Sequence, residues 1–129
     1  MLGRMDAARA IAEMTEISPQ VREVVVVGAD SSVVGSNVDR EGRAAELAEG
    51  GRRLLETAEP EQPGVAQLEA ATTAGSVFVV RDGDRLIVAT TTPEPTVGLV
   101  FYDLKTCLRS IDEPKPRRAR AGKGEDAAA

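Results

Sequence analysis

The 129-residue sequence contains no histidine and no tryptophan, and its only cysteine is Cys107. Without histidine the chain lacks the commonest general base and the commonest metal ligand of proteins. A single cysteine excludes a disulfide within the chain, and with it a secreted domain held together by disulfides. Neither a glycine-rich phosphate-binding loop nor a dinucleotide-binding fingerprint is present. These absences predict a protein that is not an enzyme and that uses no cofactor and no metal.

Long apolar segments and aromatic side chains are also scarce. No run approaches the roughly 20 apolar residues of a membrane span, and no basic leader precedes an apolar segment, so we expect a cytoplasmic protein without a membrane partner. The chain has two Phe, one Tyr and a net charge of −5. An acidic chain repels phosphate backbones and has few rings on which bases can stack, so we expect no nucleic-acid partner.

Two pairs of β-branched segments, each followed by a helical pattern, are the main positive feature of the sequence. The first pair lies at 21–27 and 33–36, and the second at 76–81 and 86–91, around the turn signal Asp82-Gly83. The nearly continuous apolar run at 21–27 is typical of a strand covered on both faces, so we expect the first hairpin at the centre of a sheet. The more polar segment 65–73 predicts an additional strand at an edge.

Three segments show helical periodicity: 4–16, about 40–58, and a stretch that ends at Ile111. The middle helix contains Gly50 and Gly51, which indicate either a benign surface or kink, or a close approach of two helices. The last helix has the clearest apolar stripe, in which we interpret Cys107 as a core residue rather than a nucleophile. The predicted core comprises Val25, Val27, Val79, Ile87, Val100, Phe101, Leu104 and Leu108.

The chain has the length of one domain, which we place at residues 1–111. Residues 112–129 are rich in Pro, Arg, Lys, Gly and Ala without apolar periodicity, so we expect a disordered charged tail. The cations between 115 and 123 are interrupted by no acid, so the segment is either a solvated tail or a weak contact for an anionic partner.

The order helix, strand, strand, helix, strand, strand, strand, helix resembles the Roadblock/dynein light chain seven domain. Three segments carry the resemblance: Ile-Ser-Pro-Gln-Val at 17–21, Arg-Ala-Ala-Glu-Leu-Ala at 43–48 and Val-Gly-Leu-Val-Phe-Tyr-Asp-Leu at 97–104. The resemblance implies an α+β fold of the Roadblock/profilin-like type. Its single five-stranded antiparallel sheet would carry the middle helix on one face and the two terminal helices on the other.

The resemblance also implies a function. Members of this family pair through the middle helix and the third strand, which implies a homodimer interface made by Ala44, Leu47, Ala48, Gly50, Gly51, Leu54, Gln67 and Glu69. Bacterial members of the MglB type are non-catalytic regulators of a Ras-like small GTPase, so the expected partners are a second copy of the chain and such a GTPase. The alternative function is a structural or signalling scaffold of the same fold with a different partner.

Overall fold

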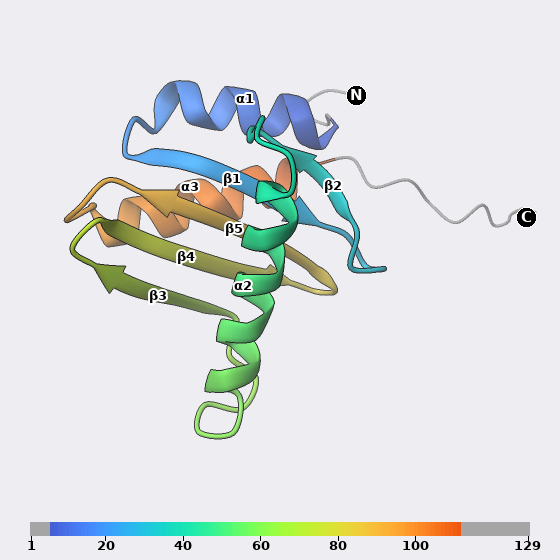
Figure 1. The fold of residues 1–129 in the computed structure, drawn as a ribbon, viewed down its shortest axis with the longest axis vertical. Coiled ribbons are helices and arrows are strands. Elements are labelled where there is room, and N and C mark those ends of the chain that lie inside the picture. Colours follow the sequence, from blue (N-terminus) through green and yellow to red (C-terminus); the bar gives the residue numbers. More distant parts are fainter. Residues whose placement is uncertain (1–5, 112–129) are drawn as a thin grey trace, which may run out of the picture.

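The computed structural model describes residues 6–111, so the tail predicted for residues 112–129 lies outside the described part. The elements follow in the order α1 (Ala7–Ile17), β1 (Val21–Val27), β2 (Val33–Ser36), α2 (Arg43–Ala58), β3 (Gln67–Thr72), β4 (Gly75–Asp82), β5 (Arg85–Thr91) and α3 (Val97–Ser110). The strands form one antiparallel sheet in the order β2-β1-β5-β4-β3, with α2 on one face and α1 and α3 on the other (Figure 1). The predicted fold class is confirmed.

The expectation that the first hairpin occupies the centre of the sheet is wrong. β2 is an edge strand, and β5 is the central strand. The chain leaves β2 through α2 and returns as β3, β4 and β5, so that β5 pairs with the free side of β1, for example through Val21 and Thr91. A hydrophobic pattern reports how well a strand is covered, but not which strand lies beside it.

Both faces of β1 are nevertheless buried, which explains its continuous apolar run. Val24 and Val26 pack in the cluster beneath α1 and α3, whereas Val25 and Val27 pack in the cluster beneath α2. Successive side chains of a strand point to opposite faces, so a strand between two helical layers needs apolar residues at every position. β1 therefore connects the two halves of the core.

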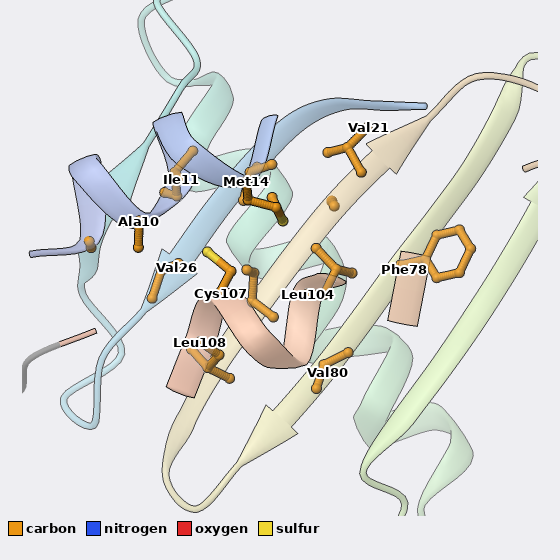
Figure 2. Close-up of a cluster of buried hydrophobic side chains, with 14 of the residues drawn as sticks. Ala10, Ile11, Met14, Val21, Val26, Phe78, Val80, Leu104, Cys107 and Leu108 are labelled. Carbon is orange, nitrogen blue, oxygen red and sulfur yellow. The ribbon is translucent and has the colours of Figure 1, made fainter. Parts of the chain in front are cut away.

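The residues predicted for the core lie in both clusters. Figure 2 shows the cluster on the α1 and α3 side, where Leu104 and Leu108 are fully buried. Phe101 is half-buried and meets Phe78 edge to face, with ring centroids 4.9 Å apart. The other predicted core residues are buried as well: Val25, Val27, Val79, Ile87 and Val100. Each large side chain buried in this way contributes about 1.5–3 kcal/mol.

The start of α2 differs from the sequence expectation. The helix begins at Arg43 after Gly42, whose positive φ of 82° is readily adopted by glycine.

No described helix is long and apolar enough to span a membrane.

Candidate interaction surface at the third strand

β3 is paired with β4 on one side and forms the edge of the sheet on the other. The Arg81 amide donates to the Ala66 carbonyl at 2.7 Å, which makes these two opposed residues a hydrogen-bonded pair. Opposed residues of antiparallel strands alternate between hydrogen-bonded and non-hydrogen-bonded pairs. The backbone N–H and C=O groups of Gln67, Glu69 and Ala71 therefore point away from β4, toward the open edge.

α2 crosses the sheet and its last turns extend beyond β3 (Figure 1). Leu54 and Ala58 lie in this part of the helix and are only half-buried. On the same face of the sheet, the opposed residues Ala70 and Val77 are also half-buried. The helix thus overhangs the sheet on one side of β3, while part of the sheet beside the helix is incompletely covered.

The residues predicted for a dimer interface divide into two groups. Leu47 is 7% exposed and packs in the chain's own core. A Cβ atom on Gly51 would lie 2.4 Å from Cγ2 of Val88, so Gly51 provides room for the chain's own sheet rather than for a second copy. Gly50 is open, with no atom within 4 Å of the corresponding position. One helical step turns the side-chain direction by about 100°, which separates these adjacent glycines.

The other residues predicted for the dimer interface lie at or near the open surface, as Gly50 does. Ala44, Ala48 and Leu54 are half-buried and pack against the cluster beneath α2. Gln67 is exposed on β3, and Glu69 is half-buried. The Glu69 carboxylate accepts a hydrogen bond of 2.8 Å from the Ser76 hydroxyl, which fixes its side chain against β4.

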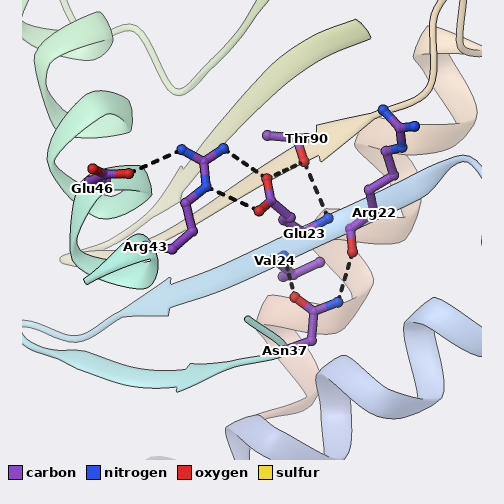
Figure 3. A network of polar contacts seen from close by, with 7 residues as sticks. All are labelled: Arg22, Glu23, Val24, Asn37, Arg43, Glu46 and Thr90. Atoms are coloured by element: carbon purple, nitrogen blue, oxygen red, sulfur yellow. Dashed lines mark hydrogen bonds and ion pairs between the residues drawn. The ribbon is translucent and has the colours of Figure 1, made fainter. Parts of the chain in front are cut away.

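An ion pair that the sequence analysis did not identify anchors the start of α2. The Arg43 guanidinium donates to both carboxylate oxygens of Glu23, at 2.9 and 3.0 Å, and the Thr90 hydroxyl donates to the same carboxylate at 3.0 Å (Figure 3). Hydrogen bonding to Arg43 lowers the pKa of Glu23, against the opposing effect of burial, and raises the pKa of Arg43. The contact joins residues 20 positions apart, so no local pattern reveals it.

Asn37 holds the segment between β2 and α2. Its side-chain carbonyl accepts from the Val24 amide at 2.7 Å, and its side-chain amide donates to the Arg22 carbonyl at 2.9 Å (Figure 3). The residue before α2 is Gly42, so neither Asn37 nor Asp39 caps the helix. Asn37 continues the pairing with β1 instead, and so sets where the chain leaves the sheet.

The loop between α2 and β3 is fixed by side chains at both of its ends. The Arg81 guanidinium donates to the Val65 carbonyl at 2.5 Å, and it lies 3.7 Å from the Glu59 carboxylate. Glu59 in turn accepts from the Gly64 amide at 2.9 Å. These contacts hold the overhanging end of α2 beside the first residue of β3, so the helix and the strand edge form one surface.

A cavity of about 470 Å³ lies on the other side of α2, above the apolar residues Val27, Leu55 and Leu86. Its charged lining contains three arginines and three acids: Arg52, Arg81, Arg85, Glu56, Glu59 and Asp84.

No group of three or more potential metal ligands occurs among residues 6–111. Burial raises the pKa of the Cys107 thiol to about 11, so the thiol is protonated at neutral pH.

Element order, sheet order and helix placement together define an α+β fold of the Roadblock/profilin-like type. The structure is similar to a Roadblock/LC7 domain from Streptomyces avermitilis, with a TM-score of 0.71, 14% identity, and coverage of 82% of this chain and 94% of that one. It is also similar to MglB from Myxococcus xanthus, with a TM-score of 0.63, 13% identity, and coverage of 81% and 89%. A third similar structure is the gliding protein MglB from Thermus thermophilus, with a TM-score of 0.61, 12% identity, and coverage of 81% of this chain and 84% of that one.

No protein-family model and no curated protein matches the sequence. At these identities the structural likeness establishes the fold, and the resemblance noted in the sequence is confirmed at that level.

Proposed function

We propose that this chain is a cytoplasmic, non-catalytic regulator of a Ras-like small GTPase and acts as a homodimer. The observation that carries the proposal is the open edge of β3 beside the overhanging end of α2, in a chain with the Roadblock/LC7 fold. An exposed strand edge is a template for pairing with another chain, and a two-fold dimer satisfies it with the same surface from both copies.

The half-buried apolar residues support pairing at this surface. Leu54 and Ala58 lie in the overhanging part of α2 and are half-buried, with Leu54 packed at the margin of the cluster beneath α2. Ala70 and Val77 are half-buried on the same face of the sheet. A two-fold axis at β3 brings the overhanging helix of each copy over the sheet of the other. The proposed interface therefore keeps Gly50, Leu54, Gln67 and Glu69 as contact residues, with Ala44 and Ala48 at its border.

A regulatory role agrees with the chemistry available in residues 6–111. The Cys107 thiol is buried, and the described residues contain no cluster of metal ligands. A regulator contributes a shaped surface, whereas the GTPase supplies the nucleotide, Mg²⁺ and the groups that act on phosphate.

Ala71→Pro tests the dimer. The Ala71 amide points away from β4, so proline there removes a donor for a second copy while the pairing of β3 with β4 remains. We expect a folded monomer by sedimentation at tens of micromolar, and a dimer for the wild type. Ala70→Pro is the matched control, because the Ala70 amide pairs with β4 and its loss destabilises the fold. A wild-type chain that sediments as a monomer contradicts the proposed dimer, and an Ala71→Pro variant that stays dimeric contradicts the β3 interface.

GTP hydrolysis and nucleotide exchange by a Ras-like small GTPase from the same organism, measured with and without this protein, test the regulatory role. We expect the wild-type dimer to change one of these rates and to distinguish the GTP-bound from the GDP-bound partner. The Ala71→Pro variant, which we expect to be a folded monomer, shows how much of this effect depends on the dimer. Equal binding to both nucleotide states without a change in either rate contradicts the proposal.

The second candidate function is a scaffold of the same fold that binds a partner other than a GTPase. The exposed apolar side chains Leu99 and Tyr102 on α3 favour it, because they are 49% and 66% exposed on the opposite face of the sheet from α2. Nucleotide-dependent co-purification separates the two functions, since only a GTPase regulator discriminates between nucleotide states.

A further inference from the structure

The alternation of backbone groups along β3 restricts how two copies can pair. In a two-fold antiparallel pair the outward groups of Gln67, Glu69 and Ala71 must face outward groups of the second copy. This condition places the axis at a residue of the strand and not between two residues. Near the middle of β3 the axis can pass through Leu68, Glu69 or Ala70.

An axis at Glu69 places two carboxylates directly opposite each other. Opposed residues in an antiparallel pair have Cβ atoms about 4.5–5.5 Å apart, and like charges in that position are destabilising. The hydrogen bond from the Ser76 hydroxyl holds each Glu69 side chain on the same face of the sheet. Both carboxylates of the opposed pair therefore lie on one face of the joined sheet, where their like charges disfavour the register.

An axis at Leu68 pairs too little of the strand. It places Ala70 to Thr72 against residues 64–66, which belong to the loop before β3. That loop is folded rather than extended: Gly64 has a positive φ of 77°, and the Val65 amide donates to the Gln62 carbonyl at 3.1 Å. Only the three residues 67–69 of each β3 then face one another.

We propose that two copies pair with Ala70 on the two-fold axis, an inference that rests on the proposed homodimer. In this register residues 68–72 of one copy face residues 72–68 of the other, which uses five of the six residues of β3. Each Glu69 lies opposite an Ala71, and the small side chain of Ala70 meets its own copy beside α2. The position of the Glu69 carboxylate along the edge then determines the register in which a second copy can pair.

Variants of the full chain that each gain one cysteine on β3 measure the register directly. Facing residues of antiparallel strands have Cα atoms about 4.5–5.5 Å apart, within the range of a disulfide. The variants are Ala70→Cys, Glu69→Cys and Leu68→Cys, each oxidised briefly, quenched with a thiol-blocking reagent and resolved on a non-reducing gel. The wild type is the control, because its Cys107 is buried.

We expect Ala70→Cys to form a covalent dimer at least tenfold faster than the other two variants. Faster cross-linking of Glu69→Cys or Leu68→Cys overturns the register. Sedimentation of the wild type separates the two levels of inference: a monomer refutes the proposed homodimer, whereas a dimer in which none of the variants cross-links refutes the register alone. Glu69→Gln gives a second measurement, and we expect a dimer dissociation constant within about twofold of the wild type.

Discussion

Gly50 and Gly51 are adjacent on one helix, and we expect the same substitution to have opposite effects at the two positions. Alanine is favoured over glycine by about 0.5–1 kcal/mol in the middle of a helix. At Gly50 nothing opposes this gain, because the space around the position is open. Gly50→Ala should therefore raise the free energy of unfolding by about that amount.

At Gly51 the gain is opposed by a clash. The added Cβ would lie 2.4 Å from Cγ2 of Val88, whereas carbon atoms in contact are about 3.5–4.0 Å apart. Val88 is fully buried on the central strand and has a stiff β-branched side chain, so helix and sheet must separate locally. Overpacking of this kind typically reduces stability by about 1–3 kcal/mol. Gly51→Ala should therefore be about 1–3 kcal/mol less stable than Gly50→Ala.

Urea unfolding followed by far-ultraviolet circular dichroism measures this difference. Both variants are best compared in the Ala71→Pro background, so that dimer dissociation does not contribute to the transition. Val88→Ala combined with Gly51→Ala should recover part of the loss, which a double-mutant cycle detects as a favourable coupling. Equal stability of the two glycine variants, or a more stable Gly51→Ala, refutes the packing argument.

Three further predictions concern a half-buried carboxylate and two buried side chains. The pKa of Glu23 is lowered by Arg43, so its contribution to stability is present above the pKa of the unfolded chain and is lost as the pH falls through the folded value; Glu23→Gln should flatten this acid dependence in urea titrations. The Cys107 thiol, with a pKa of about 11, should react with a thiol reagent at pH 8 far more slowly in the folded protein than in denaturant, and equal rates contradict its burial. Leu47→Asp should abolish cooperative thermal unfolding, because a charge enters the core without a partner; a well-folded monomer would instead restore the interface role predicted from the sequence.

The fold was predictable where one local pattern determines the outcome. The run at 21–27 indicated a strand buried on both faces, and the stripe that includes Leu104 and Leu108 indicated a core helix. The position of β2 at an edge was not predictable in this way, because strand order depends on how the chain returns from β3 to β5.

The candidate site was predicted only in part for a similar reason. The polar β3 was recognised as an edge strand, but Gly51 faces Val88 and Leu47 faces the core. The contact between Glu23 and Arg43 joins two elements whose relative position no sequence periodicity specifies.

The two edges of the sheet are built differently, and this difference limits how far the chain can assemble. β2 has four residues, and its pairing with β1 shifts in register between Val26 and Val27. Short and irregular edge strands are poor templates for a further strand. If two copies join at β3, the ends of the ten-stranded sheet are both β2. Further copies then find no favourable edge at either end, so we expect the assembly to stop at two copies rather than extend into a fibre.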